Sequence, residues 1–297
     1  MVAVSLKKFF FFFKQKTAYE IANSDWSSDV CSSDLHNNIM YINENVLDIS
    51  DESFRVLDIN VECEKIKEAA QKLNVPAGDM VAVVMSVNNM HLDKESLDNM
   101  TKRDYVRIRN KLRRISSAGF NEAGRIYDGL INDMIYFPVP VSTLDFPWVN
   151  YVDSWGYDRI YGGARHHEGT DIMADKNIAG VYPVVSICDG TVTNVGWLEL
   201  GGYRIGITSD NGIYYYYAHL SSYAQNITEG SHIKAGELIG FMGNTGYSKV
   251  EGTSGRFDVH LHFGIYITGA DGSEIALNPY NLLKNSENKV LYYKYKV

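Results

Sequence analysis

The chain has 297 residues, 45% of them hydrophobic, which is enough for one large domain with a full core and a smaller helical domain. Its formal net charge is −8 at pH 7, and only one local stretch is rich in lysine and arginine. Because nucleic-acid binding requires basic side chains that neutralise phosphates, this balance argues against nucleic acid as a partner. The sequence shows no strong sign of oligomerisation.

Residues 1–35 are predicted to be an artefact or a disordered segment. The apolar run Phe9–Phe13 is too short to span a membrane or to form the core of a signal peptide, and polar residues follow it. The segment 25–35 resembles translated sequencing-adapter DNA. The natural N-terminus can therefore be missing, so the lack of a signal peptide or anchor is not evidence for a cytoplasmic protein.

Residues 36–134 are predicted to form a helical region. Apolar residues recur at helical spacing in three stretches, near 66–73, 105–115 and 126–134. The second stretch carries a basic face between Lys102 and Arg114, which could touch an anionic wall polymer or a membrane. A solvated helix face is the favoured interpretation. We find nothing in this region that carries chemistry.

Residues 135–158 are predicted to be an extended linker, because prolines interrupt it and it has no helical period. Short β-rich runs with intervening glycines follow, and Ser209-Asp210-Asn211-Gly212 predicts a hairpin turn between two of them. We therefore expect an α+β protein, with a mainly antiparallel β domain over 159–283, open along one face into a groove, and a C-terminal tail over 284–297. The expected strands are Val184–Ile187, Gly190–Trp197, Tyr203–Ser209, Gly212–Ala218, Glu237–Met242 and Val259–Ile267.

Two short motifs suggest a metal site. His167 and Asp171 are four residues apart, and His260 and His262 are two apart. Even spacings on a strand place side chains on one face, so each pair can converge. Imidazole nitrogen and carboxylate oxygen are ligands that zinc takes. Each motif alone also occurs by chance, and a pair of half-exposed histidines needs no metal.

Four segments together resemble the lysostaphin-type (LytM-domain) zinc metalloendopeptidases, over about residues 135–283. The resemblance implies a duplicated-hybrid-motif-like β-sandwich. Its motifs arrive in the family's order and are together highly specific. They are Arg165-His166-His167-Glu168-Gly169-Thr170-Asp171, Tyr217-Ala218-His219-Leu220, Gly243-Asn244-Thr245-Gly246 and His260-Leu261-His262-Phe263-Gly264.

The resemblance implies one Zn²⁺ held by His167, Asp171 and His262, with the fourth position left for water. It also implies that His219 and His260 are not ligands. They would orient or deprotonate the water, and stabilise the oxyanion or protonate the leaving amine.

Several neighbouring residues have two open interpretations. Tyr161 stabilises the oxyanion or is a wall tyrosine. Arg165 holds a carboxylate or lines the cleft. Asn244 and Thr245 bind substrate backbone at the groove or are ordinary turn residues. His166 is expected to point away from the site.

A further asparagine, Asn150, precedes the first motif in an extended segment. It could occupy the fourth zinc position and hold the site inactive, as an upstream asparagine can in relatives. An ordinary loop asparagine is the favoured interpretation.

The function implied is a zinc-dependent endopeptidase that cuts peptidoglycan stem peptides or cross-bridges outside the cytoplasm, as a secreted or membrane-anchored protein. The alternative is a non-catalytic envelope module that binds wall peptide or regulates another hydrolase. The motifs HExxH and GxSxG are absent. Cys31, Cys63 and Cys188 lie far apart, which indicates neither a disulfide framework nor a zinc knuckle.

Overall fold

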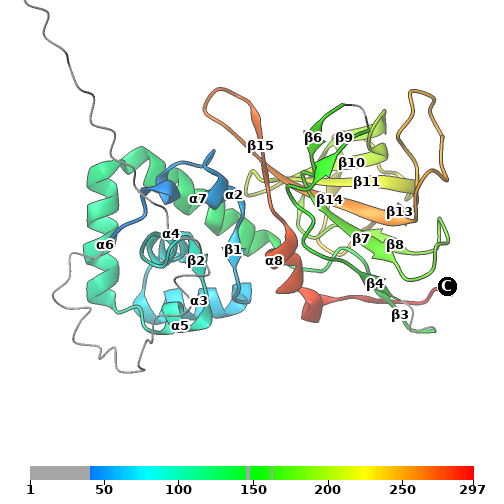
Figure 1. The fold of residues 1–297 in the computed structure, drawn as a ribbon. Coiled ribbons are helices and arrows are strands. Elements are labelled where there is room, and N and C mark those ends of the chain that lie inside the picture. The colour runs from blue at the N-terminus through cyan, green and yellow to red at the C-terminus, as the bar shows by residue number, and fades with distance from the viewer. Residues whose placement is uncertain (1–40, 145–147, 162) are drawn as a thin grey trace, which may run out of the picture. The chain divides into compact units, whose positions relative to one another are not determined.

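The computed structural model describes residues 41–144, 148–161 and 163–297 (Figure 1). The predicted artefact at 1–35 lies outside these residues. Between Glu44 and Asp133 the described chain is mainly helical. Its elements are η2 (Glu44–Leu47), α2 (Glu52–Arg55), β1 (Asp58–Ile59), α3 (Cys63–Leu73), α4 (Ala77–Val87), β2 (His91–Leu92), α5 (Lys94–Asp98), α6 (Lys102–Ile115) and α7 (Ser117–Asp133).

Helix α4 forms the centre of this helical part. Its residues 80–86 are fully buried, and it crosses α7 closely where Gly78 meets Gly124. A Cβ on Gly78 would lie 2.0 Å from the Gly124 carbonyl oxygen, so only glycine fits at the crossing. The sequence analysis missed α4, because a helix buried on every side has no amphipathic period to detect.

The remaining elements build the sheet and its flanking segments. They are β3 (Val141–Ser142), β4 (Val149–Asn150), β5 (Asp158–Arg159), β6 (Arg165–His166), β7 (Thr170–Ala174), β8 (Pro183–Val185), β9 (Gly190–Leu198), β10 (Gly202–Ser209), β11 (Tyr214–Tyr223), β12 (His232–Ile233), β13 (Leu238–Met242), β14 (His260–Thr268), β15 (Glu274–Leu277), α8 (Tyr280–Lys284), η3 (Glu287–Lys289) and β16 (Tyr292–Tyr293). The mixture of helices and antiparallel sheet confirms the expected α+β class.

One antiparallel sheet carries the site. Its strand order is β12-β9-β10-β11-β14-β7-β4, with β15 added beside β14. Strand β11 has two successive partners on one edge: it pairs with β14 as far as Ala218 and with β13 from Leu220 onward. His219 lies at this change of partner. The predicted hairpin between β10 and β11 is present.

The segments on either side of the predicted β domain also take part in pairing. Within 135–158, β3 pairs with β16 of the C-terminal tail, and β4 pairs with β7 at the edge of the sheet. Residues 42–297 form one compact unit. Among the described helices, none has both the length and the apolar character needed to cross a bilayer.

Candidate metal centre

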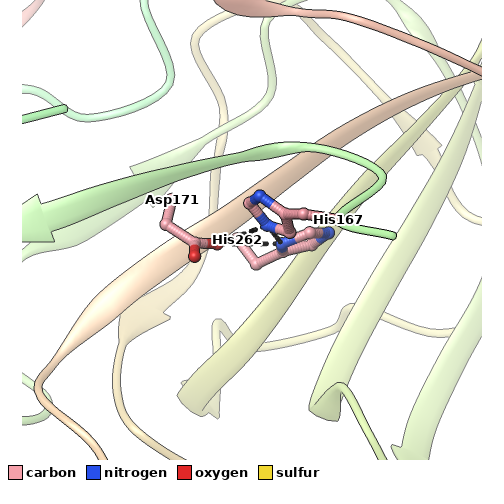
Figure 2. A group of neighbouring side chains, drawn as sticks. All are labelled: His167, Asp171 and His262. Atoms are coloured by element: carbon pink, nitrogen blue, oxygen red, sulfur yellow. Dashed lines mark hydrogen bonds and ion pairs between the residues drawn. The ribbon is translucent and has the colours of Figure 1, made fainter. Parts of the chain in front are cut away.

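Three side chains that are distant in the sequence meet in a small triangle (Figure 2). His167 Nε2, Asp171 Oδ1 and His262 Nδ1 lie 3.0 Å from one another along each side. A tetrahedral zinc ion with bonds of about 2.0–2.1 Å would place its ligand atoms about 3.3 Å apart. His167 is buried, and the other two are partly exposed. The three atoms therefore fit one face of a tetrahedral zinc site with an open fourth position.

Strand register places two members of this triangle. Asp171 on β7 is directly opposite His262 on β14, so their side chains share one face of the sheet. Gly169 leaves room for them, because a Cβ there would lie 2.7 Å from His262 Cε1 and 2.6 Å from the Phe263 carbonyl oxygen.

The prediction that strand alternation brings His167 to Asp171 is wrong, since His167 lies in the loop between β6 and β7. A loop at 154–157 holds it instead. His167 Nδ1 lies 2.9 Å from the Ser154 carbonyl oxygen, and its backbone pairs with Tyr157 and Gly156 at 2.8 Å. The hydrogen bond to the carbonyl places the proton on Nδ1, which leaves a lone pair on Nε2 for a metal.

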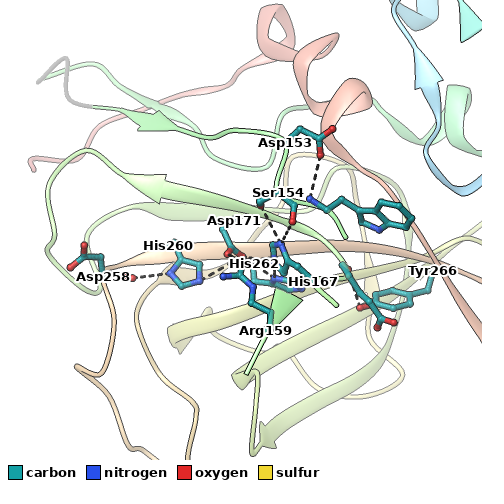
Figure 3. A network of polar contacts seen from close by, with 11 residues as sticks. Asp153, Ser154, Arg159, His167, Asp171, Asp258, His260, His262 and Tyr266 are labelled. Carbon is teal, nitrogen blue, oxygen red and sulfur yellow. Dashed lines mark hydrogen bonds and ion pairs between the residues drawn. The ribbon is translucent and has the colours of Figure 1, made fainter. Parts of the chain in front are cut away.

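Arg159 on β5 holds the second oxygen of the aspartate (Figure 3). Its Nη2 donates to Asp171 Oδ2 at 2.7 Å, so Oδ1 is left to face the two histidines. Burial acts to raise the pKa of Asp171, but the close contacts with His167 and His262 outweigh it and lower the pKa below its usual range. Asp171 is therefore a carboxylate across the physiological pH range. The sequence analysis missed Arg159, because no short motif links it to Asp171.

The two further histidines lie beside the triangle, with their ring centroids 4.7 Å apart. His260 Nδ1 bonds to the Asp258 carbonyl oxygen at 2.8 Å, and its Nε2 lies 3.8 Å from Asp171 Oδ1. His219 Nδ1 bonds to the Thr245 carbonyl oxygen at 2.7 Å. In both residues these bonds place the proton on Nδ1 and leave the Nε2 lone pair free.

His219 has a strained backbone. Its φ is +60°, in the left-handed region, which costs a residue other than glycine about 1–2 kcal/mol. The pKa of His219 is lowered well below its usual value, first by burial and then by the neighbouring His260 and His262. Burial also lowers the pKa of His260, although Asp171 opposes this effect. Both imidazoles are thereby kept neutral at neutral pH.

A cavity of about 490 Å³ opens beside the triangle and reaches along the sheet. His219, Arg165 and His166 line it, although the exposed His166 side chain makes its contacts with the Gly156 carbonyl oxygen at 3.2 Å and Asp158 at 3.3 Å. Tyrosines form much of its remaining wall. They are Tyr214, Tyr216, Tyr247 and Tyr266.

Three other predicted residues do not line the cavity. They are Asn244, Thr245 and Tyr161. Thr245 is buried, and its hydroxyl donates to the Leu220 carbonyl oxygen at 2.7 Å. The Asn244 amide donates to the Phe257 carbonyl oxygen at 3.1 Å. Both side chains are thus engaged within the fold.

The Tyr161 hydroxyl donates to the Tyr247 carbonyl oxygen, and the two rings stack with centroids 4.6 Å apart. Tyr247, which the sequence analysis did not single out, is the one of the two that lines the cavity. Asn150 is exposed on the edge strand β4, opposite Met173.

The fold and the site together define an antiparallel sheet that carries a His-Asp-His triangle able to hold a metal, with two further histidines beside it. The family model for peptidase family M23 matches residues 165–276, which include the triangle of His167, Asp171 and His262. A crystal structure of a suggested glycyl-glycine endopeptidase, LytM, from Ruminococcus gnavus is 38% identical, with a TM-score of 0.70, and the match covers 86% of this chain and 100% of that one. The chain belongs to peptidase family M23, and the resemblance found in the sequence is confirmed.

Two curated relatives each match about half of the chain. The L-Ala–D-Glu endopeptidase of Bacillus subtilis (strain 168) is 41% identical over 148 residues, which is 50% of this chain and 42% of that protein. Lysostaphin from Staphylococcus simulans is 34% identical over 146 residues, which is 47% of this chain and 26% of that protein. The chain thus spans less than half the length of these relatives.

Proposed function

We propose that this chain is a zinc-dependent endopeptidase that hydrolyses peptide bonds in peptidoglycan stem peptides or cross-bridges. The observation that carries the proposal is the 3.0 Å triangle of His167, Asp171 and His262 at the wall of a cavity lined by a further histidine, His219. A structural zinc site would fill all four positions with protein ligands. Here three protein ligands and an open cavity favour a catalytic site.

In this proposal His167, Asp171 and His262 hold one zinc ion. Such an ion lowers the pKa of water and polarises a carbonyl group when it is bound. Arg159 fixes which oxygen Asp171 offers, and the Ser154 carbonyl fixes which nitrogen His167 offers. These contacts orient the ligands before any substrate arrives.

The two other histidines would move protons. His219 and His260 each present an unprotonated Nε2, because a backbone carbonyl holds the proton on Nδ1. Such a nitrogen can accept a proton from the attacking water and return it to the leaving amine. In the protonated form it can stabilise the developing oxyanion.

Peptidoglycan is proposed as the substrate because the named relatives include an L-Ala–D-Glu endopeptidase and a glycyl-glycine endopeptidase. Action on this polymer would place the protein outside the cytoplasm, facing the cell wall. The non-catalytic alternative is less favoured. A module that only binds peptide has no need of a complete ligand triangle together with two neutral histidines.

Mass spectrometry of peptidoglycan digests tests this proposal. The chain should release fragments with new amino termini at one type of peptide bond, and a chelator should abolish their release. A His167→Ala variant should release none. Binding to peptidoglycan without new amino termini would favour the non-catalytic module instead.

A further inference from the structure

Arg204, on β10, lines the same cavity as the metal triangle. Its strand neighbour on β9 is Gly196. An added Cβ at Gly196 would meet nothing within 4 Å, so the space beside Arg204 on that strand is empty of side chains. This strand therefore leaves open space beside the backbone of Gly196.

One nitrogen of this guanidinium lacks a partner. Arg204 Nη1 is buried and makes no hydrogen bond within the described part of the chain. Nearly all buried polar groups are paired, because a buried donor without an acceptor is unfavourable. Since Arg204 shares its cavity with His167 and His262, a bound ligand could supply the missing acceptor.

Beside Arg204, two tyrosine side chains lie over glycines of the sheet. A Cβ added to Gly206 would lie 2.0 Å from the Tyr214 hydroxyl oxygen. A Cβ added to Gly201 would lie 2.1 Å from the Tyr216 hydroxyl oxygen. Larger residues at these glycines would displace the phenols. Both tyrosines line the cavity, where their hydroxyl groups can donate hydrogen bonds to an anion.

The local charge favours an anion. Burial raises the pKa of Tyr214, and the positive charge of Arg204 opposes this rise more strongly than Glu274 adds to it. Glu168 and Glu274 also line the cavity, but both are exposed to solvent. The Arg204 side chain, by contrast, is partly buried.

The distance to the metal triangle is short. The Tyr216 ring lies between the two places, with its centroid 6.0 Å from that of His262. An extended peptide advances about 3.3–3.6 Å per residue. Only strand β11 lies between the strands of Arg204 and His262, so these strands are roughly 10 Å apart, or about three residues of an extended peptide.

We propose that Arg204 binds a carboxylate of the substrate peptide and so selects acidic peptides. The inference rests on the proposed function, because it assigns a specificity to the same cavity. It narrows the substrate class to a peptide with a free carboxylate near the scissile bond, such as a D-glutamyl peptide, in place of an uncharged glycine bridge. Arg204 acts only in binding, through charge-assisted hydrogen bonds.

A matched pair of peptides tests this without requiring cleavage. The first is L-Ala-γ-D-Glu-L-Lys, whose glutamyl α-carboxylate is free, and the second is the same peptide with that group amidated. NMR titration of the full chain in the presence of a chelator should show the acid binding about 10- to 100-fold more tightly than the amide. Arg204→Gln should remove this preference, and Arg204→Lys should keep part of it.

The control is Arg125→Gln, at an arginine of α7 that pairs with Glu122. It should keep the full preference. The proposal would be overturned if the unmodified chain bound the acid and the amide equally well, or bound neither. It would also be overturned if Arg204→Gln kept the full preference for the acid.

The same two peptides, incubated with the zinc-loaded chain, separate this inference from the proposed function. Cleavage of both at equal rates would contradict the role of Arg204 and leave the peptidase intact. Acid-selective binding without cleavage would contradict the peptidase and leave the carboxylate site intact.

Discussion

At the scale of single residues, the site depends on which nitrogen each histidine presents. His167, His219 and His260 each bond through Nδ1 to a backbone carbonyl. His262 differs, because its Nδ1 faces Asp171. The assignment of His167 and His262 as ligands, and of His219 and His260 as histidines beside the triangle, predicts two classes of variant: those that lose the metal and those that lose only proton transfer.

His262→Ala should lose both zinc and hydrolysis, since it removes one corner of the ligand triangle. His219→Ala and His260→Ala should keep zinc and lose roughly a hundredfold or more in rate. Metal analysis by mass spectrometry, with the rate measured on the same samples, distinguishes the two classes. Equal loss of zinc from all three variants would show that the roles are assigned wrongly.

Arg159→Gln should weaken zinc binding about 10- to 100-fold, because Asp171 would lose the donor that orients it. Arg165→Gln is the matched control. Arg165 lies opposite Arg159 in the β5–β6 hairpin, but its Nε bonds to the Tyr161 carbonyl oxygen. Competition with a chelator gives both affinities, and the idea fails if the two variants bind zinc equally well.

These residues also show what the sequence could predict about the site. Its motifs named His167, Asp171 and His262, which the structure brings together. Arg159 and Ser154 were missed, because their contacts depend on how a hairpin and a loop fold back onto the strands. The same holds for Thr245, whose carbonyl, and not its side chain, reaches His219.

At the scale of elements, the register between β7 and β14 sets the site, and Gly169 permits it. Gly169→Ala should destabilise the fold by about 1–3 kcal/mol and reduce zinc binding, because the new methyl group would overlap the His262 ring. Denaturant unfolding and zinc titration measure the two effects. Gly230→Ala is the comparison variant. A Cβ at Gly230 would meet nothing within 4 Å, so this change adds only the backbone strain at φ +86°. It should leave zinc binding unchanged, and normal zinc binding by Gly169→Ala would contradict the packing argument.

The elements differ in how far the sequence revealed them. The long strands β9, β10, β11 and β14 were predicted, because each has a β-rich run between turn residues. Strands of two residues, such as β4 and β5, were not, since they are defined by their partners and leave no periodic pattern. Helix α4 was missed for the opposite reason, because its apolar residues surround it completely.

At the scale of the whole molecule, the helical part and the sheet meet at Asp133, the last residue of α7. Its Oδ1 accepts from Asn211 Nδ2 at 2.7 Å, and its Oδ2 accepts from the Tyr215 hydroxyl at 2.9 Å. Burial raises the pKa of Asp133 above its usual value of 3.8, although these hydrogen bonds oppose the rise. No sequence pattern predicted this junction, because its partners are about 80 residues apart.

Asp133 makes stability depend on pH. A carboxyl group whose pKa is higher in the folded state binds its proton more tightly there, so folding loses stability as pH rises from about 4 through the raised pKa. Asp133→Asn cannot ionise. The free energy of unfolding of this variant, relative to the unmodified chain, should therefore increase between pH 4 and pH 7. Denaturant unfolding at several pH values measures it, and a constant or falling difference would contradict the burial argument.

The most direct test of the whole account is a zinc titration of the zinc-free chain, with bound zinc and peptide hydrolysis followed in the same sample. The site should bind one zinc ion, and hydrolysis should rise in proportion and stop rising when that ion is bound. His167→Ala should show neither. Full hydrolysis without zinc, or equal zinc binding by His167→Ala, would contradict the metal centre assigned to His167, Asp171 and His262.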